Sequence, residues 1–406
     1  MRSRARTKPP FEYSLLLTAT LCLFAAGAVM VYSASSAESL LTDNGDPAYF
    51  LKRYLLYGAL GLAALYVASR HGLELLKALT PILLVVSFAG TVAVMVPGLG
   101  VTVNGATRWL GAGPLQFQPS ELLKVALVLY VAQLLAKRGP VLKPVLIVTG
   151  VACALLMKQP DMGTALVVCF SVGALLVAAG VPIRKLALVG GGLAFAALAL
   201  ALAEPYRRER LVAFLDPWSD AGDSGFQAVQ AMIAIGSGGL FGVGLGESVQ
   251  KVFYLPEAHT DMILAIIGEE LGLVGVLGLV ALYGLIAYAG LRAAKLARDR
   301  HAKLLAAGIT SLILCQAVLN FFAVMGLAPL TGVPLPFISY GGSNMIVLLG
   351  AMGLLLNVAA TGGKVRLRAV DGERRARAAD PDRGRRDGRA RRAGAGDRRR
   401  AAGQGR

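Results

Sequence analysis

The sequence is poor in charge, histidine and cysteine, and each shortage excludes a class of protein. Charged residues make up 16% of the 406 residues and hydrophobic residues 56%, with a mean hydropathy of +0.63. A soluble domain exposes far more charge, so the composition predicts a protein with many membrane spans. Three scattered histidines offer no metal-ligand cluster. The cysteines lie in apolar runs without metal or disulfide spacing and are interpreted as small core residues: Cys22, Cys153, Cys169 and Cys315.

Long apolar runs are abundant instead. A membrane-spanning helix needs about 20 apolar residues, or fewer where tilt or neighbouring helices help. Ten segments meet this condition and predict an all-α membrane protein with ten transmembrane helices, at residues 13–34, 54–69, 75–96, 121–136, 143–157, 162–181, 186–203, 262–291, 304–326 and 341–360. "YSASSA" in the first segment resembles a signal-peptide cleavage site, but the apolar run exceeds the usual length of about 7–15 residues. We therefore expect a retained helix.

The basic residues of the short loops predict the orientation of these helices. With ten spans, all the basic stretches fall in the cytoplasm: residues 1–12, 137–143, 184–185, 292–303 and the C-terminal tail. The uncharged loop 327–340 is expected outside. The segment 204–261 is predicted to be a large extracytoplasmic loop between helices 7 and 8, too long for a simple connection. Its apolar, glycine-rich middle is expected to lie on or dip into the outer leaflet.

Composition divides the chain into three parts. The expected ten-helix domain, residues 13–360, follows a basic cytoplasmic N-terminus of residues 1–12. From Ala360 to Arg406 there are 16 Lys and Arg against 6 Asp and Glu, a net charge of +10. This arginine-rich tail, residues 361–406, lacks aromatic residues and is predicted to be disordered. A solvated cytoplasmic tail near anionic membrane lipid is favoured over nucleic-acid binding.

Polar side chains gather in five places that this topology puts on or near the outer face. They are Arg108 with Trp109, Glu121 with Lys124, the turn from Lys158 to Asp161, the stretch 334–344 that contains Ser343, and Asp261 with Glu257 and His259 before it. An ionisable residue at membrane depth costs at least about 2.5–3.5 kcal/mol. Charges from several spans on one side therefore indicate a shared polar cavity.

Each cluster also has a structural interpretation. Glu121 and Lys124 stand three residues apart on a helix and can form an ion pair that holds the helix end. Trp109 can be an interfacial residue, and the stretch 334–344 can simply begin a helix. Asp261 can be a helix N-cap, a position that Asp suits well. Residue position and composition alone leave these alternatives open.

Several stretches together are characteristic: "GATRWLG", "FQPSELLK", "KQPDMGTA", "GFQAVQAMIAIGSGGLFGVGLG", "LPEAHTDMILAIIGEELG" and "PLPFISYGGSN". In this order, over about residues 14–360, they resemble the SEDS family (shape, elongation, division and sporulation), the FtsW/RodA peptidoglycan polymerases. The resemblance implies a ten-helix glycosyltransferase with both termini in the cytoplasm, which polymerises lipid II at the outer face of the bacterial cytoplasmic membrane. Met262 departs from the Phe that is common in the family, and we expect no loss of chemistry from it.

The resemblance implies a site built around one carboxylate. The essential Asp of the family falls in "HTD" and corresponds to Asp261, the expected catalytic base. Glu269 and Glu270 are expected to line or brace the cavity. The substrate-binding residues expected around Asp261 are Arg108, Trp109, Glu121, Lys124, Lys158, Asp161, His259 and Ser343.

The implied reaction joins two lipid-linked disaccharides with inversion at the anomeric carbon. Undecaprenyl diphosphate leaves as a stable anion and needs no general acid, unlike the leaving group of a glycosidase, so one base suffices. Cations must meet the departing charge, either from Arg108, Lys124 and Lys158 or from Mg²⁺ or Mn²⁺. The sequence shows no metal-ligand motif, so it assigns no cofactor and leaves a divalent cation open.

Two other functions compete with polymerisation. A lipid II flippase also needs buried carboxylates, but no inverted repeat relates the two halves and the polar clusters lie on one face. A non-catalytic scaffold that recruits a transpeptidase is the second. Within the family, "LPEAHTD" with "AIIGEELG" and the long tail favour an FtsW-like division protein, expected at the division septum, over a RodA-like elongation protein. The resemblance implies a class B penicillin-binding protein and divisome or elongasome membrane proteins as partners, and no nucleic acid.

Overall fold

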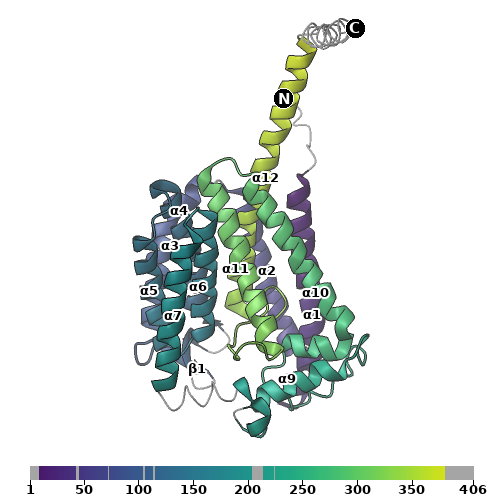
Figure 1. Cartoon of the computed structure of the whole chain (residues 1–406). Coiled ribbons are helices and arrows are strands. Elements are labelled where there is room, and N and C mark those ends of the chain that lie inside the picture. Colours follow the sequence, from purple (N-terminus) through teal and green to yellow (C-terminus); the bar gives the residue numbers. More distant parts are fainter. Residues whose placement is uncertain are drawn as a thin grey trace, which may run out of the picture. The chain divides into compact units, whose positions relative to one another are not determined.

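The computed structural model describes residues 9–42, 45–71, 73–103, 106–112, 115–203, 214–223 and 225–379. Most of them form helices packed side by side (Figure 1). The helices are α1 (Phe11–Thr42), α2 (Tyr49–Arg70), α3 (Leu73–Ala93), α4 (Pro119–Arg138), α5 (Lys143–Lys158), α6 (Met162–Ala178), α7 (Ile183–Ala203), the 3-10 helix η1 (Pro217–Asp220), α9 (Phe226–Ser237), α10 (Ile263–Lys295), α11 (Arg300–Val324) and α12 (Gly342–Ala379). The chain forms two compact units, Met1–Ala360 and Thr361–Arg406.

The ten predicted spans all coincide with helices, α1 to α7 and α10 to α12. Among the described residues, seven helices are long and apolar enough to cross a membrane: α1, α2, α3, α4, α10, α11 and α12 up to Gly362. Large apolar side chains such as Ile82, Val85 and Leu188 are exposed on the outside of the bundle, as surfaces that meet lipid require. The helical multi-pass membrane fold is confirmed, and the number of ten crossings stays a prediction.

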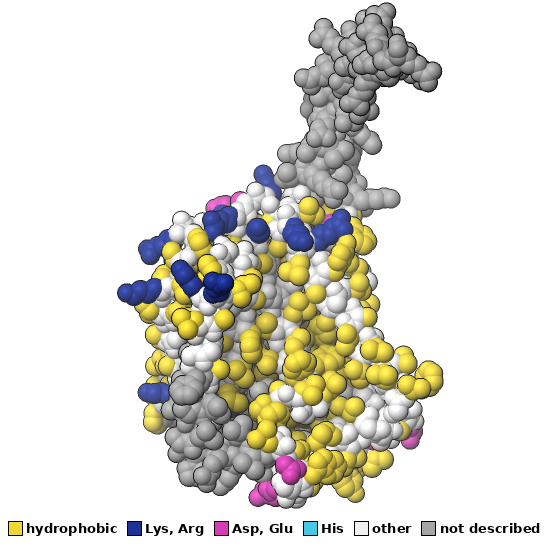
Figure 2. Space-filling model, in the orientation of Figure 1, with side chains coloured by type: hydrophobic (Ala, Val, Ile, Leu, Met, Phe, Trp, Pro, Cys, Tyr) yellow, Lys and Arg dark blue, Asp and Glu magenta, His cyan; other side chains and the backbone are white. Residues whose placement is uncertain are grey.

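Charge is unevenly distributed over the first unit. In Figure 2 most of the visible Lys and Arg side chains gather near one end of the bundle, and several Asp and Glu side chains lie at the opposite end. Hydrophobic side chains cover most of the surface between them. A hydrophobic belt between two polar ends is the arrangement that a bilayer demands.

The predicted disordered tail differs from the structure in its first part. Residues 361–379 are helical, because α12 continues to Ala379. Local composition favours this: the stretch is rich in Ala and Arg, which are strong helix formers. Residues 380–406 lie outside the described residues, as do residues 1–8 of the basic N-terminus.

A small antiparallel sheet, absent from the prediction, lies between α3 and α4 in the chain. Its strands β1 (Gly100–Val103), β2 (Ala106–Ala112) and β3 (Leu115–Phe117) pair in the order β1-β2-β3. Trp109 on β2 pairs with Val101 on β1, and the Thr102 and Thr107 hydroxyl oxygens lie 2.7 Å apart. Such short strands leave little alternating pattern, so periodicity does not reveal them. The sheet carries the predicted residues Arg108 and Trp109.

Helix α10 is broken at Gly272, where the backbone has φ +64° and ψ −161°. The part from Leu273 to Lys295 measures about 34 Å, which alone spans the hydrocarbon core of a bilayer. The predicted eighth span, residues 262–291, coincides with this broken helix, and the position of the membrane boundary along it stays a prediction. Glu269 and Glu270 directly precede the break.

The loop after α9 supplies the hydrogen bonds that the break removes. The amides of Leu273 and Val274 donate to the carbonyls of Gly239 and Leu240, and the Val243 amide donates to the Glu269 carbonyl at 2.9 Å. The backbones approach so closely that a Cβ atom on Gly242 would lie 2.1 Å from the Glu270 carbonyl oxygen. The glycine-rich stretch therefore has a structural role: its backbone bonds to both sides of the break in α10.

This close approach gives a testable stability prediction. Gly242→Ala should lower the free energy of unfolding by about 1–3 kcal/mol, because the new methyl group overpacks a rigid backbone contact. Gly246→Ala is the matched control, since Gly246 also has a positive φ, +88°, but a Cβ atom there would meet no described atom within 4 Å. Thermal unfolding of the detergent-purified protein measures both. Equal losses for the two variants would show that backbone conformation, and not the contact, requires glycine.

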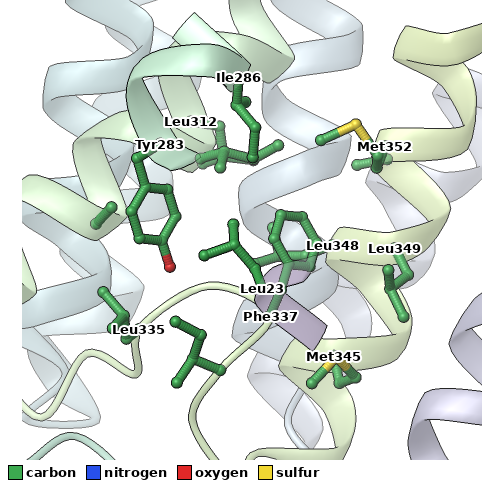
Figure 3. Close-up of a cluster of buried hydrophobic side chains, with 14 of the residues drawn as sticks. Leu23, Tyr283, Ile286, Leu312, Leu335, Phe337, Met345, Leu348, Leu349 and Met352 are labelled. Carbon is green, nitrogen blue, oxygen red and sulfur yellow. The ribbon is translucent and has the colours of Figure 1, made fainter. Parts of the chain in front are cut away.

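The uncharged loop between α11 and α12 is packed inside the bundle. Phe337 is fully buried at φ +65° and contacts a core that includes Leu23, Tyr283 and Leu348 (Figure 3). The Tyr283 hydroxyl donates to the Pro336 carbonyl at 2.6 Å, and the Tyr54 hydroxyl donates to the Phe337 carbonyl at 2.7 Å. Irregular backbone at this depth is stable only when its polar groups are satisfied by protein. The stretch 334–344 therefore leads into α12 and also forms part of the buried core.

Candidate active site

Asp261 lies directly before α10, and its side chain is partly exposed. The N-cap of α10 is Met262, so Asp261 does not have the capping role that its position allowed. The Thr260 hydroxyl oxygen lies 3.1 Å from Asp261 Oδ1 and 2.8 Å from Glu257 Oε2, within donating distance of both carboxylates. Burial and the negative charge of Glu257 raise the pKa of Asp261 to about 6. A carboxylate with this pKa is ionised at neutral pH and is a stronger base than an ordinary Asp.

The start of the α11–α12 loop passes beside this carboxylate. A Cβ atom on Gly332 would lie 3.9 Å from Asp261 Oδ2. The same loop touches the beginning of α6, where a Cβ atom on Gly163 would lie 2.4 Å from the Thr331 carbonyl oxygen. The loop therefore lies between Asp261 and the N-terminus of α6, and it links two of the predicted polar clusters.

Asp161 caps the N-terminus of α6. Its Oδ1 accepts from the Thr164 amide at 3.2 Å, and its Oδ2 accepts from the Ser120 hydroxyl on α4, also at 3.2 Å. Ser343, at the beginning of α12, accepts from the Gln118 amide at 2.9 Å. These contacts join α4, α6 and α12 at one end of the bundle and bring the predicted residues Asp161 and Ser343 together.

Glu121 and Lys124 form the expected ion pair, with Lys124 Nζ 2.9 Å from Glu121 Oε1 and both side chains at most 3% exposed. Lys124 also donates to Gln316 Oε1 on α11 at 3.0 Å. Gln316 Nε2 in turn donates to the Pro334 carbonyl at 2.8 Å and to Asn344 Oδ1 at 3.1 Å. A buried chain of polar groups thus runs from α4 through α11 to the loop beside Asp261.

Arg108 is bonded to the turn that directly precedes Asp161. Its Nε donates to the Gln159 carbonyl at 3.2 Å and its guanidinium also contacts the Pro160 carbonyl, so β2 is tied to the turn between α5 and α6. Lys158, at the end of α5, is exposed. Both cations therefore flank the turn that carries Asp161, with Lys158 open to the surroundings.

His259 has a packing role in this structure. Its ring lies 4.1 Å from the Phe50 ring and 5.6 Å from the Tyr340 ring, and its Nδ1 lies 3.6 Å from Glu38 on α1. The Tyr340 amide donates to its carbonyl at 2.9 Å. His259 thus holds the segment before Asp261 against α1, α2 and the α11–α12 loop.

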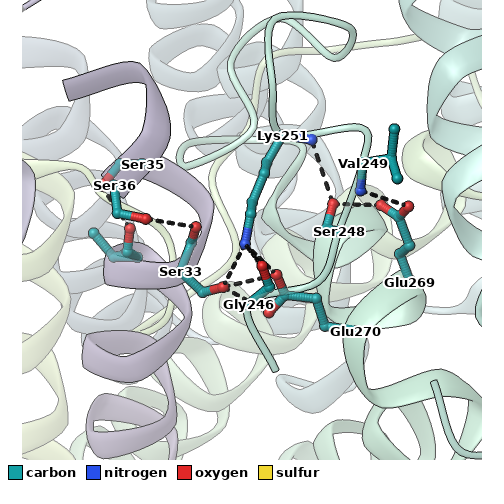
Figure 4. A network of polar contacts seen from close by, with 10 residues as sticks. Ser33, Ser35, Ser36, Gly246, Ser248, Val249, Lys251, Glu269 and Glu270 are labelled. Carbon is teal, nitrogen blue, oxygen red and sulfur yellow. Dashed lines mark hydrogen bonds and ion pairs between the residues drawn. The ribbon is translucent and has the colours of Figure 1, made fainter. Parts of the chain in front are cut away.

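Glu269 and Glu270 bind the loop between α9 and α10 (Figure 4). Glu270 Oε1 accepts from Lys251 Nζ at 2.9 Å, and both of its oxygens lie 2.7 Å from the Ser33 hydroxyl on α1. Glu269 accepts from the Ser248 hydroxyl and from the Val249 amide. Of the two expected roles, lining and bracing, these contacts support bracing.

The most informative residues that the sequence analysis missed are Gln316 and Asn320 on α11. Asn320 Nδ2 donates to the Asp261 carbonyl at 2.7 Å and to the Val333 carbonyl at 2.8 Å. The signal was present: two amide side chains four residues apart on an apolar span share one face and need partners there. Lys251 was also missed, because its partners Glu270 and Ser33 are distant in the sequence.

No metal site emerges from the described part of the chain, where no three His, Cys, Asp or Glu side chains gather as ligands. The four cysteines are free, but their interpretation as core residues is wrong, because Cys22 is exposed and the other three are only partly buried. The sulfur atoms of Cys153 on α5 and Cys169 on α6 lie 3.5 Å apart. The described side chains at the site are carboxylates, hydroxyls, amides and cations.

The fold and the site define a multi-pass membrane protein with a polar reaction site at one end of its helical bundle. The chain belongs to the FtsW/RodA/SpoVE family of cell cycle proteins, whose family pattern matches residues 13–363. It is 45% identical over 357 residues to the "Probable peptidoglycan glycosyltransferase FtsW" of Thioalkalivibrio sulfidiphilus, covering 84% of this chain and 88% of the relative. It is 38% identical to stage V sporulation protein E of Bacillus subtilis, covering 87% and 98%.

Solved structures agree with this membership. A chain from a peptidoglycan synthase complex, studied for its coordination of polymerization and crosslinking, matches with a TM-score of 0.71 and 30% identity, over 86% of this chain and 97% of the other. The rod shape determining protein RodA of Thermus thermophilus matches with a TM-score of 0.61 and 31% identity, over 85% and 95%. The family predicted from the short sequence stretches is thereby confirmed.

Proposed function

We propose that this protein is a peptidoglycan glycosyltransferase that polymerises lipid II into glycan strands. The observation that carries the proposal is the single carboxylate of Asp261, partly exposed and with a raised pKa, beside a loop that contacts α6 and is held by α11. The FtsW relatives support the enzyme class and favour a role in cell division. An elongation role of the RodA type is the alternative within the family.

The proposed chemistry needs one base and several cations. Asp261 takes the proton from the acceptor sugar hydroxyl as that oxygen attacks the anomeric carbon of the donor. The bond to undecaprenyl diphosphate breaks, the configuration inverts, and the diphosphate departs as an anion that needs no proton. Glu257 is negatively charged and close, so it keeps Asp261 basic and takes no part in the bond changes.

The three candidate cations differ in availability. Lys124 is 1% exposed and already engaged by Glu121 and Gln316, so its proposed role is to brace α4 against α11. Lys158 is exposed, and the hydrogen bonds of Arg108 within the described chain go to carbonyl groups. A diphosphate is a stronger partner for a guanidinium than a carbonyl is, so Arg108 and Lys158 are the proposed anion-binding pair.

The proposed setting is the bacterial cytoplasmic membrane, with both termini in the cytoplasm and the Asp261 end outside. Most of the visible positive charges collect at one end of the bundle, whereas the polar site lies where α5 ends at Lys158 and α6 begins after Asp161, which supports this orientation. The similarity to a chain of a peptidoglycan synthase complex supports a class B penicillin-binding protein as partner.

Reconstitution tests the function directly. The purified protein, with its penicillin-binding partner, is placed in vesicles with fluorescent lipid II, and glycan chains and lipid translocation are measured in the same sample. Polymer formation supports the proposal. Translocation without polymer would assign the flippase function instead.

The raised pKa of Asp261 predicts the pH dependence of the rate. Because only the ionised carboxylate accepts a proton, kcat/KM should level off above about pH 6 and fall about tenfold per pH unit below it. An Asp with an ordinary pKa of about 3.9 would show no fall in this range. Steady-state rates in vesicles, with the protein's stability checked at each pH, distinguish the two curves.

A further inference from the structure

Asn320 on α11 is the residue that fastens the backbone around Asp261. Its amide nitrogen donates two hydrogen bonds, one to the carbonyl of Asp261 itself and one to the carbonyl of Val333. The first fixes the main chain that carries the base, and the second fixes the loop that passes beside the carboxylate. The Asn320 side chain therefore links the main chain at Asp261 to the loop at Val333 that passes beside the carboxylate.

The orientation of this amide is dictated by its two acceptors. A flipped amide would point Oδ1 at two carbonyl oxygens, which cannot donate. As it stands, Asn320 is 2% exposed and its Oδ1 has no hydrogen-bond partner among the described residues. A buried acceptor without a partner reduces stability. The contacts of this amide within the described chain are therefore the two bonds that its nitrogen donates, one to each side of the base.

Gln316 extends the same clamp by one helical turn. It lies four residues before Asn320 on the same face of α11, and it donates to the Pro334 carbonyl and to Asn344 at the beginning of α12. Its own oxygen accepts from Lys124. The two amides together hold consecutive carbonyls of the loop, Val333 and Pro334.

We infer that Asn320 is a positioning residue for catalysis, which holds the Asp261 main chain and the 331–334 loop at the separation that keeps the carboxylate partly shielded from water. Gln316 supports the loop side of this clamp. The inference rests on the proposed role of Asp261 as the base. Asn320 itself contacts only backbone and takes no part in the bond changes.

The hydrogen bonds from Asn320 and Gln316 affect the pKa of Asp261 by controlling how far its carboxylate is exposed to water. The described groups that face Asp261 are the Glu257 carboxylate and the Thr260 hydroxyl on its own turn, and the backbone of the loop at Gly332. Of these, Glu257 raises the pKa of Asp261 together with burial. When the loop moves away, burial decreases while Glu257 stays, so the carboxylate becomes less basic and less well placed.

The test uses the full chain with its partner in vesicles. Asn320→Leu keeps the approximate volume and removes both donors. We expect kcat to fall about 10–100-fold, as for a displacement of the base by a fraction of an ångström to one ångström. The apparent pKa of the kcat/KM profile should move below its wild-type value near 6. Asn320→Gln, which restores the amide on a longer side chain, should recover part of the rate.

Controls separate positioning from folding. Thr310→Val is the matched control, because Thr310 is also buried on α11 but its hydroxyl bonds to the Ala306 carbonyl of its own helix. It should keep the wild-type rate and pH profile. If Asn320→Leu does not fold, Asn320→Ser, which is too short to bridge both carbonyls, replaces it in the same assay.

Two results would overturn the inference. Asn320→Leu or Asn320→Ser with wild-type kcat, or with a reduced kcat and an unmoved pH profile at equal amounts of folded protein, would show that the amide is only structural. A failure of the proposed function looks different: Asp261→Asn would then be active, or the wild-type profile would have no step near pH 6.

Discussion

Asp261→Asn is expected to lower the rate of lipid II polymerisation by about 10²–10⁴-fold, which is the usual contribution of a general base. The amide matches the carboxylate in shape, so it can keep the hydrogen bond with Thr260 while it loses the ability to take a proton. Chain growth from purified lipid II in vesicles, with the penicillin-binding partner present, measures the loss.

Stability should not explain this loss. Because the folded protein raises the pKa of Asp261 above its unfolded value, the proton is held more tightly in the folded state. That contribution is fully present below the ordinary Asp pKa and disappears as the pH rises through about 6. At neutral pH the ionised carboxylate therefore weakens the fold, and a neutral amide should leave the protein as stable as the wild type or more stable.

Glu257→Gln is the matched control for Asp261→Asn. Glu257 is the neighbouring carboxylate, it shares the Thr260 hydroxyl, and its charge helps to raise the pKa of Asp261. Its loss should preserve polymerisation at neutral pH and move the acidic limb of the pH profile to lower pH. An inactive Glu257→Gln together with an active Asp261→Asn would transfer the role of base to Glu257.

The sequence predicts the helical scaffold well because hydropathy is a local property. Each apolar segment, from 13–34 to 341–360, coincides with a helix, since an isolated span in lipid has no alternative but to satisfy its own backbone. The break inside the eighth segment could not be predicted. The amides of Leu273 and Val274, just after Gly272, donate to the carbonyls of Gly239 and Leu240, which are more than thirty residues earlier in the chain.

The charged residues of the candidate site could be predicted from the sequence, but the hydrogen bonds that join them to the rest of the fold could not. Asp261, Asp161 and the Glu121–Lys124 pair stand out because charge is rare in this chain. Gln316 and Asn320 are neutral, and their partners are backbone carbonyls of a loop without charge. A carbonyl carries no sequence signal, so only the folded chain shows which amides hold the loop.

Lys251→Met is expected to lower the free energy of unfolding by about 3–5 kcal/mol, because it leaves the buried Glu270 carboxylate without its cation. Lys251 is 7% exposed and Glu270 is fully buried, so neither charge has water as an alternative partner. Ser33 would remain as a donor from α1, but one hydroxyl replaces an ammonium group poorly. Thermal and denaturant unfolding in detergent measure the loss.

The double variant Lys251→Met/Glu270→Gln should recover most of that stability, because it removes both charges and keeps an amide that can bond to Ser33. Lys52→Met is the surface control: Lys52 pairs with Asp46 at 2.7 Å, but the two side chains are 68% and 36% exposed, and such solvent-screened pairs contribute little to stability. If Lys251→Met cost no more than Lys52→Met, the contact with Glu270 would not be what fastens this loop. Because the same loop splices the broken α10 and leads directly to Asp261, its release should also slow polymerisation in the Lys251→Met protein, and the double variant should regain rate and stability together.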